Sequence, residues 1–339
     1  PGPIPATECK RQFYGATYLL DQIGDKLGIV DDLKASFPDR YKQLLSLAYF
    51  FVLEEGMSAY RLRKWALTHK HPYGRDIPSQ RISDLMGSID EASKMNFFRR
   101  QAKRRAEKEY LAFDTTSISS YSELIKLAKY GKNKEGDHLP QVNLALLYGE
   151  VSRLPVYFRK LTGNTADVSL IRNLMLDIDF LDMKKLSFVM GRGFYSEKNI
   201  SDLMKRHHKF LIGIRCGLKI ARKHLDEIRG EKMISWENYH DDVGLYAMSF
   251  TDEWDYREEQ PRTGKCICDK RRVYVHIYFN DQRCTDERLS FARYLTCLQD
   301  ELKSGRKTDG HMKDYDKYFI VTETPKRGLH IVPKGDAIR

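Results

Sequence analysis

The first residue whose type and position could support chemistry is Asp114, the acid that closes a short apolar run at 110–114. A carboxylate at the end of a buried strand can hold a divalent cation, because the sheet fixes its position while the edge stays open to substrate. Thr115, Thr116 and Ser117 follow it and offer no second carboxylate. An acid that only ends a strand and turns the chain is the more common case, so Asp114 alone leaves both interpretations open.

A strand that ends on Asp114 needs a sheet around it, and the following sequence predicts one. Hydrophobic periodicity and turn residues place the next elements in this order: strands at 141–148 and 154–161, a helix from 167, a strand at 186–190, a helix at 197–207 and a strand at 209–214. The first two of these strands are joined across Gly149, which predicts a hairpin. We therefore expect a mixed α/β sheet covered by helices over 110–217.

The segment before this sheet, 1–109, is predicted to be a helical domain. Apolar residues at helical spacing around Ile23 predict one inner face, and Gly28 follows as a C-cap. Ser88 to Glu91 has the spacing of a capping box before a last helix. That helix is basic, with Arg99, Arg100, Lys103, Arg104 and Arg105. A basic helix in a compact helical module suits DNA contact, and a solvated basic face remains the alternative.

The segment after the sheet, 218–339, is predicted to be a β-rich α+β domain. Apolar residues alternate with polar ones over 273–279, which is typical of a half-buried strand. Thr285 is expected to cap a helix whose inner face carries Leu298 and Leu302. A polar stretch at 304–314 is expected to be a loop, and strands at 318–322 and 329–332 are expected to pair.

The charge balance favours a polyanionic partner. Lys and Arg total 58 against 47 Asp and Glu, which gives a formal net charge of +11. A positive protein gains association free energy by releasing counterions from phosphates, although many soluble proteins are basic without binding nucleic acid. The most apolar run, 44–53, is about half the ~20 residues needed to span a bilayer. We therefore expect no membrane partner and a cytoplasmic, nucleoid-associated location.

Several motifs occur in a fixed order along the chain. After Asp114 come Gly131-Lys-Asn-Lys134, Pro140-Gln-Val-Asn143, Pro155, Gly163-Asn-Thr-Ala-Asp167 and Val189-Met-Gly-Arg-Gly-Phe-Tyr-Ser196. Their order and wording resemble the insertion sequence 4 superfamily of DDE transposases, in particular members whose second motif is Asp-Arg-Gly-Phe-Tyr-Ser. The segments 41–79 and 271–302 are similar to those proteins too. The resemblance covers nearly the whole chain, and the agreement of several motifs in order makes it specific.

The resemblance implies a ribonuclease H-like core with a β-rich insertion. In that family three carboxylates hold two Mg²⁺ (or Mn²⁺) ions. One ion activates the attacking water or 3′-hydroxyl, and the other stabilises the leaving oxygen of an in-line phosphoryl transfer. Asp114 matches the first carboxylate. Arg192 follows the second position and would either contact DNA phosphate or pair with an acid. The implied partner is double-stranded DNA at terminal inverted repeats, bound by a homodimer on paired ends.

The sequence departs from the family at the other two carboxylates. Position 191, where the second carboxylate should stand, is Gly. The third, a Glu in the pattern Tyr-x2-Arg-x3-Glu-x6-Lys, has no match at any Tyr of the chain. The chain ends at Arg339, where the insertion is expected to finish and the last catalytic helix to follow. We therefore expect a chain truncated before that helix and impaired in DNA cleavage.

Three interpretations follow from these residues. The first is a cut-and-paste transposase, weakened by the loss of two metal ligands. The second is a remnant that binds DNA without cleaving it, since phosphate contacts do not need the metal site. The third is the product of a decayed gene with no function. Steep salt dependence of DNA binding without metal-dependent nicking would favour the second.

Overall fold

The chain divides into two compact units, Pro1–Arg215 and Cys216–Arg339. The computed structural model describes residues 11–105, 109–131, 138–165, 167–183, 185–230, 232–259, 266–324 and 328–338. Each unit is described by itself. The expected boundary near residue 110, between a helical domain and the sheet, falls inside the first unit and stays a prediction.

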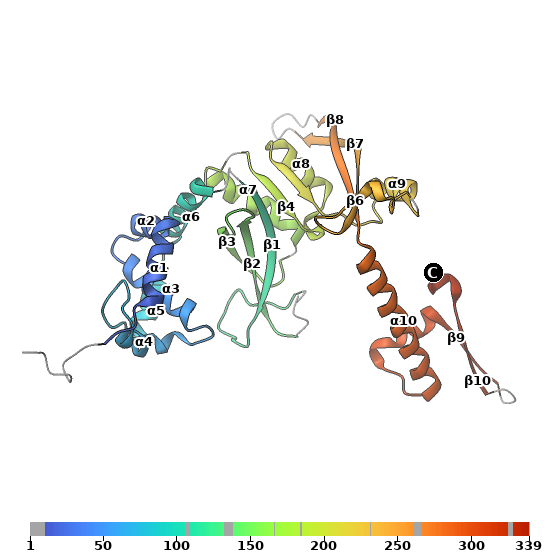
Figure 1. Ribbon diagram of the computed structural model, residues 1–339, viewed down its shortest axis with the longest axis horizontal. Helices are drawn as coiled ribbons and strands as arrows, with labels where there is room; N and C mark the ends of the chain where they lie inside the picture. The colour runs from blue at the N-terminus through green and yellow to red at the C-terminus, as the bar shows by residue number, and fades with distance from the viewer. Residues whose placement is uncertain are drawn as a thin grey trace, which may run out of the picture. The chain divides into compact units, whose positions relative to one another are not determined.

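The first part of the chain is helical, as the periodicity indicated. Its helices are α1 (Gly15–Lys26), α2 (Ile29–Ser36), α3 (Tyr41–Leu53), η1 (Ala59–Arg61), α4 (Leu62–Thr68), α5 (Ser79–Gly87) and α6 (Glu91–Arg105) (Figure 1). Their core contains Phe50, Leu62 and Trp65, with the Phe50 and Trp65 rings edge to face at 5.9 Å. Gly28 follows α1 with φ +70°, a left-handed conformation that favours glycine and confirms the expected helix end.

Two details of this helical part differ from expectation. The apolar face predicted for α1 is exposed, with Leu19 59% and Ile23 42% accessible, and the buried residues of α1 are Thr17 and Gly24. The close approach of α2 explains why Gly24 is buried on α1, because a Cβ at Gly24 would lie 3.0 Å from a Val30 methyl group. The N-cap of α6 is Asp90, whose carboxylate accepts the Ser93 N–H at 2.8 Å. Ser88 instead donates to the Leu85 carbonyl.

The sheet has five strands in the order β3-β2-β1-β4-β5. They are β1 (Tyr110–Ser119), β2 (Gln141–Gly149), β3 (Pro155–Thr162), β4 (Ser187–Met190) and β5 (Lys209–Ile212). The first three are antiparallel neighbours, and β4 and β5 add in parallel to β1. This topology is that of the ribonuclease H-like fold, so the predicted fold class is confirmed.

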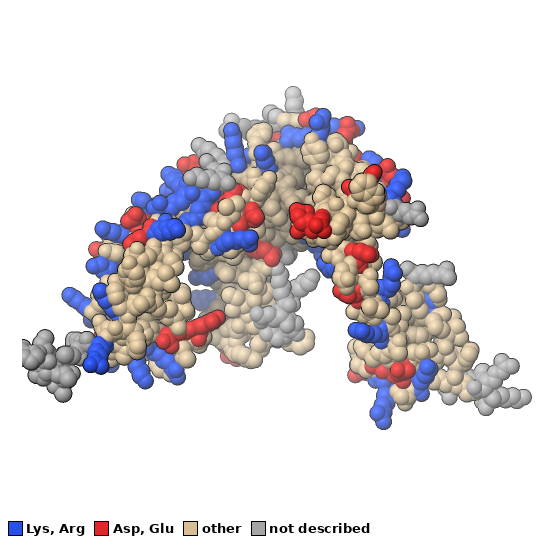
Figure 2. Space-filling view, viewed as in Figure 1, with Lys and Arg blue, Asp and Glu red and all other residues tan. Residues whose placement is uncertain are grey.

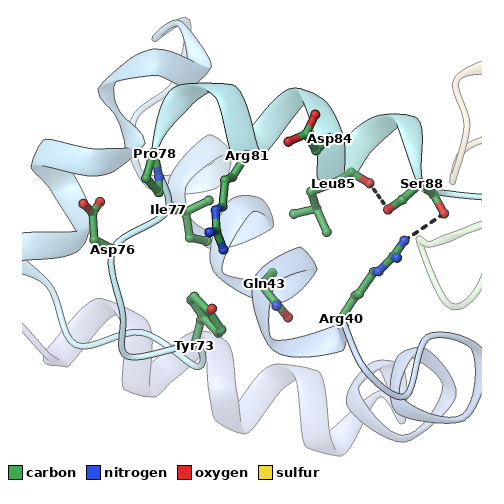
Figure 3. Close-up of a pocket in the computed structure, with 10 residues that line it drawn as sticks. All are labelled: Arg40, Gln43, Tyr73, Asp76, Ile77, Pro78, Arg81, Asp84, Leu85 and Ser88. Carbon is green, nitrogen blue, oxygen red and sulfur yellow. Dashed lines mark hydrogen bonds between the residues drawn. The ribbon is translucent and has the colours of Figure 1, made fainter.

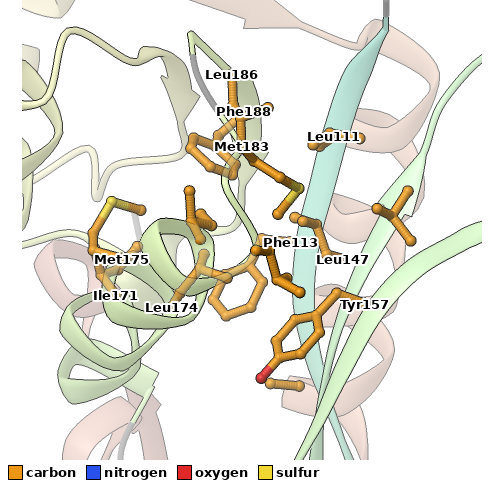
Figure 4. Packing of buried hydrophobic residues seen from close by; sticks show 14 of the residues in the cluster. Leu111, Phe113, Leu147, Tyr157, Ile171, Leu174, Met175, Met183, Leu186 and Phe188 are labelled. Atoms are coloured by element: carbon orange, nitrogen blue, oxygen red, sulfur yellow. The ribbon is translucent and has the colours of Figure 1, made fainter. Parts of the chain in front are cut away.

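One face of the sheet is packed by helices. Helix α7 (Asp167–Phe180) buries Ile171, Leu174 and Ile178 against Leu111 and Phe113 of β1. Figure 4 shows Leu174 on the side of the helix that faces Phe113 of β1. Helix α8 (Glu197–Lys205) adds Leu203 to the same cluster. Burying such side chains contributes about 1.5–3 kcal/mol each, so this cluster fixes β1, which carries Asp114, and β4, which ends just before Gly191.

Strand β1 is longer than the apolar run predicted. It continues through Asp114 to Ser119, because Thr115 and Ser117 alternate inward as buried polar residues opposite β2. Ser117 donates to the Asn143 amide oxygen at 3.1 Å, which satisfies part of that polar interior. Asp114 is therefore in the middle of β1, and the strand that ends beside it is β4.

The second unit contains a three-stranded and a two-stranded sheet. Its elements are α9 (Lys219–Ile228), η3 (Trp236–Asn238), β6 (Tyr239–His240), β7 (Leu245–Glu259), β8 (Cys266–Phe279), α10 (Asp281–Ser304), η4 (Asp309–His311), α11 (Met312–Tyr318), β9 (Phe319–Thr324), β10 (Gly328–Pro333) and α12 (Gly335–Ile338). The cap of α10 is Asn280, whose side chain accepts the Arg283 N–H at 2.7 Å, and not Thr285. The expected loop at 304–314 contains η4 and the start of α11. The predicted pairing of the last two strands is confirmed.

In the described part of the chain, every helix is too short or too polar to cross a lipid bilayer.

Helices α10 and α11 are joined through Glu301. Its carboxylate accepts hydrogen bonds from the Tyr315 hydroxyl, from His311 Nδ1 at 2.9 Å and from Thr308 Oγ1 at 3.0 Å. These donors, Tyr315 first, lower the pKa of Glu301 to about 2 from an ordinary value of 4.5. Three donors on one carboxylate explain why the polar stretch after α10 is ordered into helix rather than loop.

The low pKa of Glu301 predicts a pH-dependent stability of the second unit. A depressed folded-state pKa adds stability that is present above pH 4.5 and is lost as the pH falls toward 2. We expect the melting temperature of the chain to drop over this window, and Glu301→Gln to reduce that drop. The measurement is thermal unfolding by circular dichroism at half-unit pH steps. An unchanged pH profile in Glu301→Gln would contradict the assignment.

Candidate active site and nucleic-acid interface

Asp114 lies on the face of β1 opposite the packed core. Its neighbours in sequence, Phe113 and Thr115, are 3% and 5% exposed, whereas Asp114 is exposed. The alternation follows from the two-residue period of a strand, since Phe113 packs against residues of α7 and of η2 (Arg192–Phe194) and Asp114 therefore points outward. The carboxylate is therefore carried by a rigid central strand and remains accessible to a ligand.

The strand register brings position 191 beside Asp114. In the parallel ladder between β1 and β4, the last pair is Phe113 with Met190. The next residues along the two strands are Asp114 and Gly191, and both are exposed. Neighbouring strands lie about 4.8 Å apart, so side chains at these two positions would contact the same bound ion or molecule. The strand register therefore places side by side positions 114 and 191, to which the family pattern assigns the first and second carboxylates.

Glycine is not required at position 191 by the backbone. Gly191 has φ −71° and ψ 167°, an extended conformation that any residue adopts. A Cβ built on it would meet no heavy atom within 4 Å. An aspartate therefore fits at this position without strain, and the absence of a carboxylate here is a matter of residue type alone.

The residues after Gly191 form a tight turn that positions Arg192. Phe194 is buried against Phe113 with ring centroids 4.9 Å apart, and its carbonyl accepts the Asn199 amide at 2.7 Å. Ser196 caps α8 by accepting the Asn199 N–H at 3.1 Å. Arg192 is exposed, and within the described ranges its guanidinium has no ion-pair partner. Contact of Arg192 with DNA phosphate therefore stays a prediction.

The motif residues of β2 have a structural role that sequence reasoning missed. Gln141 and Asn143 donate to the carbonyl of Gly163 at 2.9 and 3.2 Å, and Asn143 is itself held by Ser117. A Cβ at Gly163 would lie 2.0 Å from the Gln141 carbonyl oxygen, so only glycine fits there. The available signal was the placement of amides at the inward positions of an otherwise apolar strand. We refer to these contacts as the Gly163 pin.

The side chains at and around Asp114 do not supply the ligands that a two-metal centre needs. Over the residues that the structure describes, no group of three or more His, Cys, Asp or Glu side chains is arranged to hold a metal ion. At the family's metal position, Asp114 supplies one carboxylate and Gly191 supplies none. No catalytic step through a metal can therefore be derived for this chain.

Several cations of the basic helix α6 have internal hydrogen-bond partners. Arg104 donates two hydrogen bonds to the buried Asp32, at 2.7 and 2.8 Å, and this contact raises the pKa of Arg104 above its ordinary value. Arg105 is buried and donates to the Leu27 carbonyl at 2.9 Å. Arg99 donates to the Phe180 carbonyl at 2.8 Å and lies over that ring.

These internal contacts are an alternative use of Arg99, Arg104 and Arg105, and DNA contact by these three residues stays a prediction. Arg100 and Lys103 are exposed, and DNA contact stays a prediction for them. Figure 2 shows Lys and Arg side chains gathered where α6 lies in Figure 1. These contacts could not be read from the helix sequence, since their acceptors come from α2, from α7 and from Leu27 at the end of α1.

A pocket of about 620 Å³ lies among residues 40–88 of the helical part. Ile77 and Leu85 form its apolar wall, and Arg81 points into it (Figure 3). Arg40 donates to the Ser88 carbonyl at 3.2 Å at its rim. Asp114 does not line this pocket, so it is separate from the candidate active site. Sequence reasoning missed it because its lining comes from segments thirty residues apart.

The sequence of the sheet region decides the family. Residues 105–286, more than half of the chain, match the family model described as transposase DDE domain. This chain belongs to the transposase DDE domain family. Its matched segment contains Asp114, Gly191 and Arg192. No curated protein sequence matches the chain.

Solved transposase structures show a remote likeness. A piggyBac transposase synaptic complex with hairpin DNA has 15% identity and a TM-score of 0.32, and the match covers 73% of this chain and 51% of that one. A Mos1 transposase paired-end complex with left transposon end has 13% identity and a TM-score of 0.24, over 59% of this chain and 69% of that one. A Mos1 mariner paired-end complex with Mn has 14% identity, a TM-score of 0.24 and the same coverage. The chain thus spans about half the length of the piggyBac chain. A likeness at this level identifies no shared function.

Proposed function

We propose that this chain is a DNA transposase of the insertion sequence 4 superfamily whose strand-cleaving site is impaired by Gly191. The observation that carries the proposal is the β1–β4 register, which aligns Asp114 with position 191 on one exposed face. Membership of the transposase DDE domain family supports the reaction class, phosphoryl transfer at the ends of a DNA element. The missing carboxylate at 191 supports the impairment.

DNA binding does not depend on the missing ligand. Arg100 and Lys103 on α6, and Arg192 beside Asp114, are exposed cations, and the chain carries a net charge of +11. Phosphate contacts of this kind release counterions and give affinity without base recognition. The partner we propose is double-stranded DNA at terminal inverted repeats, bound by a homodimer at the nucleoid in the cytoplasm. The second candidate function, a non-cleaving DNA-binding protein, is favoured by the same exposed cations.

The test combines binding and cleavage on one duplex. We expect the chain to bind a 40-base-pair duplex with an affinity that falls steeply with salt, and to leave it uncut in Mg²⁺ or Mn²⁺. Electrophoretic mobility shift and a nicking assay on labelled strands measure the two properties. Metal-dependent nicking that disappears in Asp114→Asn would contradict the impairment. An absence of salt-dependent binding would contradict both candidate functions.

Arg192 gives a specific prediction within this test. Replacing Arg192 with Ala is expected to reduce the slope of log affinity against log salt concentration by about 1, because one phosphate contact is lost. The fold should be unaffected, since the side chain is exposed. Arg293→Ala, an exposed arginine on α10, is the matched control and should leave the slope unchanged. Equal slopes for Arg192→Ala and the unchanged chain would remove Arg192 from the interface.

A further inference from the structure

Strand β8 begins with two cysteines, Cys266 and Cys268, which are separated by Ile267. Side chains two residues apart on a strand lie on the same face, so both thiols extend from one side of β8. Their Sγ atoms lie 3.6 Å apart, and both residues are exposed. The strand therefore presents two sulfur ligands that are close together, open to solvent and not used by the candidate active site.

A disulfide between these two thiols would be strained. The ladder with β7 continues through both cysteines, which holds this part of β8 extended. Residues two apart on an extended strand are separated by about 6.6 Å from Cα to Cα, and disulfides rarely span more than about 6.8 Å. A strained and exposed disulfide is readily reduced, so the dithiol is the stable form of the pair under reducing conditions.

The spacing of the two sulfurs suits a single bound ion. With the sulfurs 3.6 Å apart, an ion at about 2.3 Å from each, the length of a zinc–thiolate bond, would subtend an angle of about 100°. Thiolates are soft ligands that favour Cu(I) and Zn²⁺ over Mg²⁺, Ca²⁺ and Mn²⁺. The pair is therefore a candidate site for a thiophilic ion, and its chemistry differs from that of the single carboxylate at Asp114.

The number of ligands separates Cu(I) from Zn²⁺. Structural zinc sites have four protein ligands, and catalytic zinc sites have three. In the ranges that the structure describes, no third His, Cys, Asp or Glu joins the two cysteines in a metal-binding group. Two thiolates are enough for Cu(I), and rotation of the exposed side chains opens the angle at the ion toward the linear arrangement of two-coordinate Cu(I). The ligand count therefore favours Cu(I).

A cation lies across the ladder from the pair. Arg257 is the residue of β7 directly opposite Cys268, and it is exposed. Opposite residues of an antiparallel pair have their Cβ atoms about 4.5–5.5 Å apart, which places a guanidinium within reach of the sulfurs. Cu(I) with two thiolates carries one negative charge. The charge of Arg257 offsets it.

We propose that Cys266 and Cys268 bind one Cu(I) ion as a two-thiolate site, with Arg257 offsetting the charge of the complex. Binding forms two Cu–S bonds and releases the two thiol protons, and the copper stays in its monovalent state. Because both sulfurs are exposed, the ion can pass to and from small thiols in solution, so the site suits exchange of the ion. The inference does not depend on the proposed DNA transposase function.

The experiment titrates the full, reduced chain with Cu(I) in the absence of oxygen, with bicinchoninate as a coloured competitor for the ion. We expect the chain to withdraw one Cu(I) ion from the competitor. Cys266→Ser and Cys268→Ser are each expected to weaken binding by about 100-fold or more, because the second thiolate binds as an intramolecular ligand. Zn²⁺, titrated against a colorimetric zinc chelator, should bind more weakly than Cu(I).

Cys216→Ser is the matched control, since Cys216 is an exposed cysteine of the same unit outside β8. It should leave the Cu(I) affinity unchanged. Arg257→Ala should weaken binding by a smaller factor than loss of a thiol, and Arg257→Lys, which keeps the charge, should retain the affinity. Equal losses in Cys216→Ser and Cys268→Ser, unchanged Cu(I) affinity in Cys268→Ser, or tighter binding of Zn²⁺ than of Cu(I) would overturn the proposal.

Discussion

Replacing Gly191 with Asp is expected to raise the affinity of the chain for Mn²⁺ by about 100-fold or more, since even indirect supports of a metal ligand are worth about 10- to 100-fold. The two carboxylates would extend from adjacent parallel strands, level with each other on one exposed face. Oxygen ligands of this kind suit Mn²⁺ and Mg²⁺. Isothermal titration with MnCl₂, supported by the loss of the free Mn²⁺ paramagnetic signal, measures the affinity.

The stability of Gly191→Asp should depend on metal. Without metal we expect a small change, because replacing a glycine in an extended conformation stabilises by about 0.4–1 kcal/mol and repulsion from Asp114 opposes it. With Mn²⁺ at about 100 times its dissociation constant, the folded state should gain about 2.7 kcal/mol. A Cβ at position 191 has open space around it, so a steric clash contributes to neither value.

Two controls separate ligation from packing in this prediction. Gly191→Asn has the same shape without the charge and should bind Mn²⁺ no better than the unchanged chain. The double variant Gly191→Asp with Asp114→Asn should lose the gain. Tight binding by Gly191→Asn would show that position 191 is not a carboxylate ligand site. We expect no DNA cleavage from Gly191→Asp, because the family's third carboxylate has no match among these 339 residues.

Replacing Arg104 with Ala is expected to lower the free energy of unfolding by about 3 kcal/mol. Asp32 is 2% exposed, and Arg104 supplies two of the hydrogen bonds to its carboxylate, with Gln101 supplying another at 2.6 Å. Breaking a buried pair costs about 3–5 kcal/mol, and the lower value applies because the Arg104 side chain is 42% exposed. Urea unfolding followed by circular dichroism measures the change.

Lys103→Ala is the matched control for Arg104, because the two residues are neighbours on α6 and Lys103 is exposed. It should change stability by no more than about 0.5 kcal/mol. For DNA binding we expect the opposite order of effects. Lys103→Ala should reduce the slope of log affinity against log salt concentration by about 1, whereas folded Arg104→Ala should leave that slope unchanged. Equal stability losses in the two variants would show that the contact with Asp32 does not hold α2 to α6.

The fold was predictable because its signals are local. Alternating and helical spacing identified the sheet and its helices, and the order of elements then limited the topology. The errors arise where a distant segment decides the outcome. Ile23 is exposed because α2 approaches α1 at Gly24, and β1 runs past Asp114 because β2 supplies polar partners for Thr115 and Ser117.

The candidate site was predictable only through the family motif. Composition and spacing left Asp114 open between a metal ligand and a strand-ending acid, and nothing local marked Gly191. The structure adds the register that places the two side by side. The internal contacts of Arg104 and Arg105 were not predictable, because the sequence of a basic helix does not show that distant residues such as Asp32 and Leu27 will accept its hydrogen bonds.

The Gly163 pin has a consequence for how such a chain evolves. Its hydrogen bonds join β2 to the loop before α7, and none of them involves Asp114 or Gly191. Selection for a folded protein and selection for strand cleavage therefore act on different residues of the same domain. Under the proposed function, a lineage can lose cleavage by one substitution at position 191 and keep its fold, and the surviving surfaces then remain available for a different use.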